Sequence, residues 1–272
     1  MHTKYVDDLL IAEALNMQEC LIANPKRPLP DPYHSRLGLK LDPEKSKVYK
    51  VNKYAETNQM KINQSKSKFI LFNPTKSYDF TPEFKLEDTP LETVESMKLL
   101  GLVIANDLSW KLNTQNLTRK AYGILWSIKR IVKHGATLND LIDVYIKQVR
   151  SILEFGVPVW NSSLTKQESL EFERVQKAFH HIALGNSYFD YESALDITRL
   201  ETLEARRIRL CINFSKKASK HPKHRHWFAP TNSEIPNTRR IKMKFKKPIC
   251  RLKRFECSPI PYLTSLLNNS SQ

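Results

Sequence analysis

The sequence predicts an α+β protein, with short strands in its first part and amphipathic helices in its second. Strand-like apolar segments lie at residues 68–72, 83–86 and 98–104. After about residue 110 the apolar residues recur at helical spacing instead. This change of period separates a mixed N-terminal region from a helical one.

The first hundred residues are expected to contain a hairpin, a long loop and a helix. Residues 5–12 (YVDDLLIA) are typical of a β-hairpin, in which two short apolar arms flank an Asp-Asp turn. Five prolines between residues 23 and 44 predict a loop, because proline interrupts both helices and strand ladders. The apolar residues between 45 and 60 share one face of a helix.

Four amphipathic helices are expected in the second part of the chain. Their limits are, in chain order, residues 117–132, 139–155, 165–185 and 201–219. Thr165 and Glu168 form a capping box that begins the third helix. Gly156 and Gly185 end the second and the third. In the fourth, the basic residues are expected largely away from the apolar face.

The net charge of +16 is concentrated in one stretch. Residues 206–257 contain 17 lysines and arginines against two acidic residues, whereas the rest of the chain has 27 basic and 26 acidic residues. Such a stretch attracts phosphate backbones through counterion release. The alternative is a solvated stretch that only aids solubility. We expect no membrane partner, because no apolar helix face accompanies the charge and no segment is apolar enough to cross a bilayer.

The cysteines and the chain ends indicate the environment of the protein. Four widely separated cysteines form no disulfide framework, and acidic residues lie where a signal peptide would be apolar. We therefore expect an intracellular protein, in the nucleus or the cytoplasm. From residue 221 onward, the sequence has six prolines and no glycine among clustered lysines and arginines, which predicts partial disorder.

The segment Tyr5-Val6-Asp7-Asp8 contains the residues best suited to catalysis. Template-directed polymerases use two metal ions to activate the primer hydroxyl and to stabilise the leaving pyrophosphate. Mg²⁺ prefers oxygen ligands that are held rigidly, and an Asp-Asp hairpin turn presents a carboxylate in this way. For these four letters on their own, a solvent-facing hairpin tip is the alternative.

The order of the later segments resembles the C-terminal part of reverse transcriptases from non-LTR, LINE-like (jockey-like) retrotransposons. YVDD resembles their palm motif, and residues 60–72 (MKINQSKSKFILF) look like the segment that follows the catalytic hairpin. Residues 99–110 look like the hairpin that grips the primer. Matches to the thumb and downstream region lie at residues 120–122, 150–160, 173–177 and 203–207. The resemblance covers most of residues 4–228 in collinear order.

The resemblance implies an RNA-directed DNA polymerase, with an RNA template and a DNA primer as partners and Mg²⁺ as cofactor. By this resemblance Asp7 is the metal ligand and Asp8 supports it. Tyr5 and Val6 would line the primer and nucleotide site. Lys66 would lie near the incoming triphosphate.

The chain also departs from the pattern of that family. The fingers and the other metal-binding aspartate lie upstream of YVDD in the family, whereas only residues 1–4 precede it here. We therefore expect a partial palm at residues 1–110, a helical thumb and connection at 111–220 and a basic, poorly ordered tail at 221–272. A non-catalytic nucleic-acid-binding protein and a translated remnant without a selected role are the alternatives.

Six residues of the basic stretch are candidate nucleic-acid contacts: Arg206, Arg207, Arg209, Lys216, Lys217 and Trp227. For the arginines, phosphate binding and solvation of the outer helix face are both open interpretations. Trp227 and Phe228 lie among basic residues and are suited to stacking on bases. Trp160 follows an apolar helix and is expected in the core.

The three histidines His221, His224 and His226 are candidate ligands of a zinc site. No Cys-x₂-Cys pair occurs, and the spacing of Cys250 and Cys257 is too wide for a normal knuckle. A solvated, histidine-rich basic stretch is therefore the preferred interpretation. His180 and His181 are expected on the surface of the third helix.

The first prediction concerns catalysis. We expect no primer extension by the purified chain on an RNA template with Mg²⁺ or Mn²⁺, because the second palm aspartate is not found in this sequence. Incorporation of labelled nucleotide is the measurement, and Asp7→Ala is the control variant. Extension by the wild type that disappears in Asp7→Ala would contradict the prediction.

Overall fold

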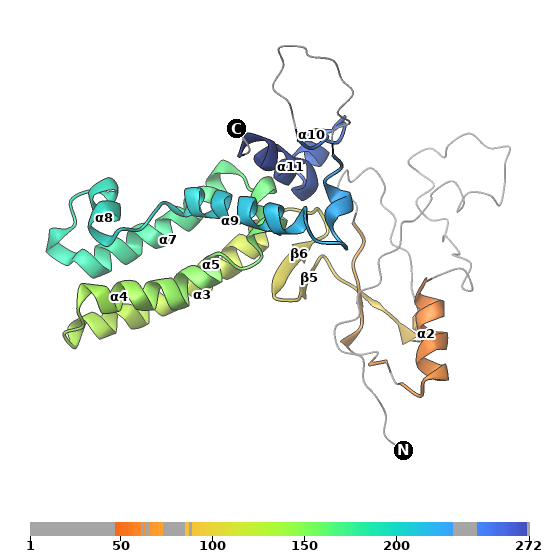
Figure 1. Ribbon diagram of the computed structural model, residues 1–272. Helices are drawn as coiled ribbons and strands as arrows, with labels where there is room; N and C mark the ends of the chain where they lie inside the picture. Colours follow the sequence, from red (N-terminus) through yellow and green to blue (C-terminus); the bar gives the residue numbers. More distant parts are fainter. Residues whose placement is uncertain are drawn as a thin grey trace, which may run out of the picture. The chain divides into compact units, whose positions relative to one another are not determined.

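The computed structural model describes residues 47–60, 62–63, 66–72, 85–86, 89–230 and 244–270. The chain divides into two compact units, Met1–Ser109 and Trp110–Gln272. The described residues combine helices with short strands, so the predicted α+β class is confirmed at this level (Figure 1). The hairpin expected at residues 5–12 and the loop expected at 23–44 lie outside the described residues.

The first unit contains one helix and three two-stranded sheets among its described residues. Its elements are α2 (Lys47–Thr57), β1 (Lys68–Phe69), β2 (Lys85–Leu86), β3 (Thr89–Pro90), β4 (Glu92–Thr93), β5 (Ser96–Leu99) and β6 (Leu102–Ala105). β1 pairs with β4 in parallel, and the pairs β2–β3 and β5–β6 are antiparallel. The strand expected at residues 68–72 is therefore shorter than predicted, and an ion pair of 3.1 Å between Lys68 and Glu92 accompanies its pairing.

The apolar segment at residues 98–104 belongs to a hairpin. The register pairs Leu99 with Leu102, which leaves Leu100 and Gly101 as a two-residue loop. Both loop residues have positive φ, at 45° and 92°, as a type I′ turn requires. Gly101 adopts this conformation without strain, and it lets the chain reverse within the apolar run.

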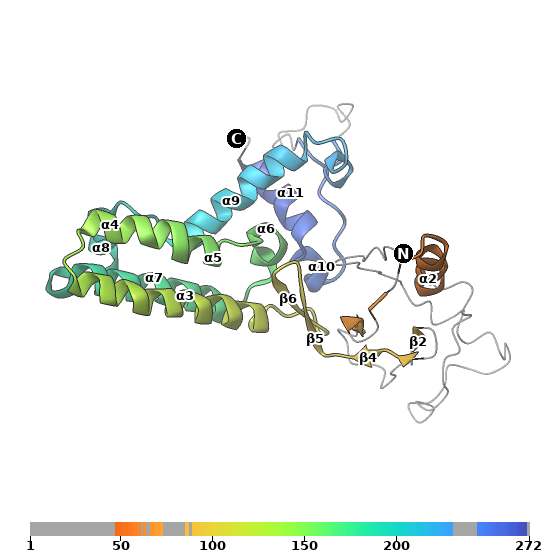
Figure 2. The same cartoon turned by 90° about the horizontal axis from the view of Figure 1, so that it is seen from below.

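The second unit is helical. Its described elements are α3 (Lys111–Lys133), α4 (Leu138–Val144), the π-helix η3 (Tyr145–Arg150), α5 (Ser151–Leu153), α6 (Val157–Trp160), η4 (Asn161–Ser163), α7 (Lys166–Leu184), η5 (Gly185–Ser187), α8 (Tyr191–Thr198), α9 (Leu203–Ala218), η6 (Arg225–Trp227), α10 (Lys253–Glu256) and α11 (Pro259–Asn269). α3 and α7 lie side by side, and α9 packs against α6, α7 and α11 (Figure 2).

Local sequence signals explain where most of these helices begin and end. The capping box of Thr165 and Glu168 is confirmed, with the Glu168 carboxylate 2.7 Å from the Thr165 backbone nitrogen. Gly156 ends the second helical segment in the left-handed region, at φ 69°. Pro158 then lies in the first turn of α6, where the missing amide hydrogen costs no helix hydrogen bond.

The core of the helical unit forms where α3, the α4–η3–α5 segment and α7 meet. The expected apolar stripe of α3 is confirmed, with Leu117, Ala121, Leu125 and Ile128 all at most 2% exposed. Two pairs of aromatic rings stack across the helices: Tyr145 on Phe179 at 4.1 Å, and Trp160 on Phe172 at 5.1 Å. The core position expected for Trp160 is thus confirmed.

A buried polar network joins α7, α8 and α9. The carboxylate of Glu173 accepts hydrogen bonds from the Tyr191 hydroxyl at 2.6 Å and from the backbone nitrogen of Glu204 at 2.7 Å. Gln176 accepts a hydrogen bond from the Tyr145 hydroxyl at 2.6 Å and donates one to the Glu201 carbonyl at 2.9 Å. The first turn of α9 is therefore capped by a side chain of α7.

One expectation about burial is wrong, and one part of the C-terminal tail is more ordered than expected. His180, expected on the helix surface, is fully buried, and its ring meets the edges of Phe179 and Tyr191. The tail expected to be poorly ordered from residue 221 contains α11, in which Leu263, Thr264 and Leu267 are buried. The high proline content misled the prediction, because Pro259 and Pro261 lie in the first turn of α11, where proline is tolerated.

The second prediction tests the packing of α11. Replacing the buried Leu267 with alanine should lower the free energy of unfolding by about 2–5 kcal/mol, because the substitution leaves a cavity in the core. Urea denaturation followed by circular dichroism measures this loss. Leu252→Ala is the matched control, because Leu252 is 71% exposed. Equal, small effects of both substitutions would show that α11 does not belong to the core.

The third prediction concerns pH. Burial lowers the pKa of His180 from 6.5 to about 4. The unfolded chain therefore binds a proton between these values that the folded chain excludes, so His180 destabilises the fold as the pH falls from 6.5 to about 4. Unfolding midpoints in urea at several pH values should fall less steeply for His180→Leu than for the wild type. The exposed His181→Leu is the control, and identical pH profiles for all three proteins would contradict the prediction.

Candidate nucleic-acid interface

The structure describes only part of the predicted polymerase site. Tyr5, Val6, Asp7 and Asp8 lie outside the described residues. Lys66 is exposed in a turn, where its backbone nitrogen donates to Asn63. The roles that the resemblance implies for these five residues stay predictions.

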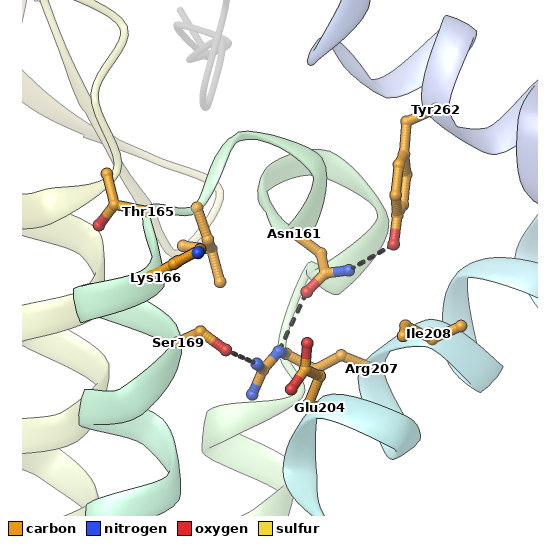
Figure 3. A pocket seen from close by; sticks show the side chains of 9 residues that line it. Asn161, Thr165, Lys166, Ser169, Glu204, Arg207, Ile208 and Tyr262 are labelled. Carbon is orange, nitrogen blue, oxygen red and sulfur yellow. Dashed lines mark hydrogen bonds between the residues drawn. The ribbon is translucent and has the colours of Figure 1, made fainter.

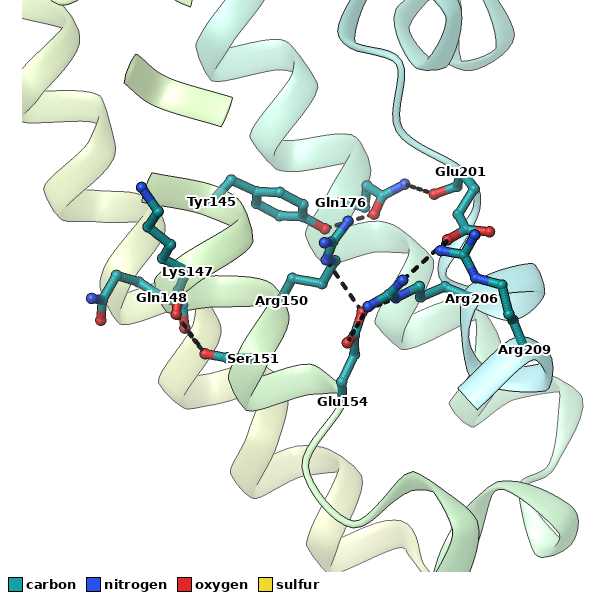
Figure 4. A network of polar contacts seen from close by, with 10 residues as sticks. All are labelled: Tyr145, Lys147, Gln148, Arg150, Ser151, Glu154, Gln176, Glu201, Arg206 and Arg209. Atoms are coloured by element: carbon teal, nitrogen blue, oxygen red, sulfur yellow. Dashed lines mark hydrogen bonds and ion pairs between the residues drawn. The ribbon is translucent and has the colours of Figure 1, made fainter. Parts of the chain in front are cut away.

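Two of the three candidate arginines on α9 are engaged in ion pairs within the helical unit (Figure 4). Arg206 forms a bidentate pair with Glu154, at 2.8 and 3.2 Å, which raises the pKa of its guanidinium. Arg150 contacts the same carboxylate at 3.2 Å. Arg209 pairs with Glu201. The Arg206–Glu154 pair joins the end of α5 to α9, whereas the Arg209–Glu201 pair lies within the α9 region. Much of the charge counted in the first half of α9 is therefore compensated.

Arg207 is buried, contrary to its expected position away from the apolar face. Its side chain is 2% exposed, and burial lowers the pKa of its guanidinium. Nε donates to Asn161 Oδ1 at 3.0 Å and Nη2 donates to Ser169 Oγ at 2.6 Å, while the guanidinium lies over the ring of Phe172. Arg207 thus connects α9 to η4 and α7 and is not placed to reach a phosphate on the surface.

A small pocket of about 170 Å³ lies beside Arg207 (Figure 3). Tyr262 of α11 closes one side, with its hydroxyl accepting a hydrogen bond from Asn161 at 3.1 Å. The lining of the pocket contains side chains of opposite charge, Lys166 and Glu204. The pocket is too small and too mixed in charge to hold a nucleic-acid strand.

The second half of α9 presents its basic residues to solvent. The predicted contacts Lys216 and Lys217 are exposed, and Trp227 is half-buried in η6. The α9-end cluster, as we call it, comprises Lys216, Lys217, Lys220, Lys223 and Arg225, all of them exposed. No acidic residue occurs between Glu204 and Glu234, so the sequence around this cluster is uniformly basic.

A second basic surface, which was not predicted from the sequence, lies on α3. The helix has six basic residues and no acidic one. Two of its aromatic side chains are exposed, Tyr122 at 44% and Trp126 at 62%, and the guanidinium of Arg130 lies 5.1 Å from the Trp126 ring centroid. The α3 face comprises the exposed residues Arg119, Tyr122, Trp126, Arg130 and Lys133.

Helical spacing produces the α3 face. Its five members are three or four residues apart, so they follow one side of the helix while the apolar stripe faces the core. Gly123 is exposed on the same helix, with open space around its Cα. A count of charge for each helix separately would have found this surface. The positive charge of α3 is hidden in the total for the residues outside 206–257, because that total is nearly neutral.

The residues that the structure describes offer no other obvious site. They contain no group of three or more His, Cys, Asp or Glu side chains that could hold a metal ion. Among them, His221 and His224 instead stack ring on ring at 4.9 Å. Within the same part of the chain, no helix is long and apolar enough to span a membrane.

No protein-family model, curated protein sequence or solved structure matches the chain.

Proposed function

We propose that this chain binds nucleic acid, as part of an RNA-directed DNA polymerase of a non-LTR retrotransposon. The observation that supports the binding is the α3 face, where basic residues flank two exposed aromatic rings and the helix contains no acidic residue. The polymerase part of the proposal depends on the resemblance of the YVDD segment and the segments after it. Mg²⁺ would then be held by Asp7, with Asp8 in support.

The composition of the α3 face suits a nucleic-acid strand. Each lysine or arginine that meets a phosphate releases condensed counterions, which favours binding at low salt. Exposed tryptophan and tyrosine rings are costly on a surface without a partner, and they stack on bases or pack against sugars. An acidic protein would satisfy the charges but gives no reason for two exposed aromatic rings in line with them.

A non-catalytic nucleic-acid-binding protein is the second candidate function. The observation that favours it is that both basic surfaces, the α3 face and the α9-end cluster, lie in the helical unit, apart in sequence from YVDD. The two candidates share the binding activity and differ in catalysis. Binding by the α3 face is therefore the property to test first.

The fourth prediction tests the α3 face. Replacing Arg119, Arg130 and Lys133 together with glutamine should weaken binding to RNA or DNA and reduce the slope of log K against log salt by roughly 2–3, since each lost phosphate contact contributes about 0.7–0.9. Trp126→Ala should weaken binding about tenfold or more at every salt concentration and leave the slope unchanged. Fluorescence anisotropy with a labelled oligonucleotide measures both effects.

Matched controls lie elsewhere on the helical unit. Lys166→Gln and Phe189→Ala remove an exposed cation and an aromatic ring that is 88% exposed, neither of which belongs to the α3 face. Circular dichroism should show an unchanged fold for all variants, because every substituted side chain is exposed. If the triple variant binds with the affinity and salt slope of the wild type, the α3 face is not the interface.

A further inference from the structure

Three aromatic rings follow one another in a row just after α9, one pair stacked and the other tilted. The ring of His221 stacks on that of His224 with centroids 4.9 Å apart and planes inclined by 26°. The ring of His224 lies 4.6 Å from that of Trp227, inclined by 38°. The three residues are spaced three apart through a turn and η6, so their side chains line up on one side. We call this row the ring ladder.

The backbone segment that carries the ring ladder is anchored to the helical unit on both sides. It follows directly on α9, and Phe228, the next residue after Trp227, is buried against Phe245 at 6.1 Å. Two hydrogen bonds then join the backbone of Phe245 to the side chain of Asn268 in α11, at 3.0 and 2.9 Å. A platform that is fixed before binding loses little conformational entropy when a ligand stacks on it.

The outer end of the ring ladder is open to solvent. His221 is exposed, and within the described residues no other ring contacts it besides His224. The backbone nitrogen of Lys223 donates to Nδ1 of His221 at 3.2 Å. An imidazole nitrogen accepts in the plane of its ring, so this bond restrains the orientation of the imidazole without covering its faces.

The basic residues of the α9-end cluster lie just before the ring ladder in the chain and between its members. Its five basic residues are exposed, and no described residue forms an ion pair with any of them. This contrasts with Arg206 and Arg209 in the first half of the same helix, which are paired with glutamates. Cations without partners next to an open ring face combine the two features by which proteins hold single strands, a charged track and a stacking platform.

We propose that the ring ladder binds unpaired bases, so that this region takes a single-stranded segment of RNA or DNA in preference to a duplex. The inference rests on the proposed nucleic-acid binding and adds the kind of strand. In a duplex the faces of the bases are covered by their neighbours, whereas an unpaired base presents a free face to the ring of His221. The cations of the α9-end cluster contact the backbone on either side of that base.

The fifth prediction tests this preference with the full chain. Anisotropy titrations compare a labelled single-stranded oligonucleotide with a fully paired, blunt-ended duplex that has the same number of phosphates. His221→Ala should weaken binding to the single strand about tenfold, with little effect on the duplex and no change in the salt slope. Trp227→Phe, which keeps a ring in the ladder, should bind the single strand more tightly than Trp227→Leu, which removes it.

The control variants separate stacking from charge and from folding. His181→Ala removes another exposed histidine and should leave both affinities unchanged. Lys216→Gln with Lys217→Gln should reduce the salt slope for the single strand. Since His221 is exposed, its replacement does not disturb the core, so the result does not depend on how well the Trp227 variants fold.

The outcomes distinguish this inference from the proposed function. If the wild type binds neither probe, both proposals fail. If it binds and the α3 variants lose affinity, but His221→Ala affects single strand and duplex equally or not at all, the ring ladder only packs against the end of α9. In that case the proposed function stands and the preference for unpaired bases is overturned.

Discussion

The buried carboxylate of Glu173 decides where α9 begins, and the rest of the helical unit depends on that position. It accepts hydrogen bonds from the Tyr191 hydroxyl and from the backbone nitrogens of Leu203 and Glu204. A buried carboxylate is costly unless its oxygens are satisfied, and the free amides of a helix N-terminus satisfy them well. One residue of α7 thereby holds both the first residue of α8 and the start of α9.

The basic residues of α9 have two roles: those in its first half stabilise helix packing, and those in its second half face solvent. The first half directs Arg206 and Arg209 to glutamates and buries Arg207 between η4 and α7. The second half presents Lys216 and Lys217 to solvent and leads into the ring ladder. The net charge of a stretch thus overestimates the interface, because cations that stabilise helix packing are not available to a phosphate.

α3 shows the same division across one helix. One side supplies Leu117, Ala121, Leu125 and Ile128 to the core. The other side carries basic residues and two aromatic rings. Aromatic rings normally gain most by burial, so Trp126, at 62% exposed, is out of place on the surface of an isolated protein. Its neighbour Arg130 covers part of the ring and remains available to a phosphate.

The sequence by itself determined the α+β class, the α3 stripe, the capping box at Thr165 and the core position of Trp160, because each depends on residues close together in the chain. It also indicated that the basic side chains of Lys216 and Lys217 are accessible. The tertiary structure decided the burial of Arg207, whose partner Asn161 is 46 residues away, and the order of α11, which is joined to Phe245 through Asn268. It decided as well that His180 lies inside, between Phe179 and Tyr191. Whether a polar side chain lies inside or outside depends on partners that the fold brings together from distant parts of the chain, and local periodicity contains no information about them.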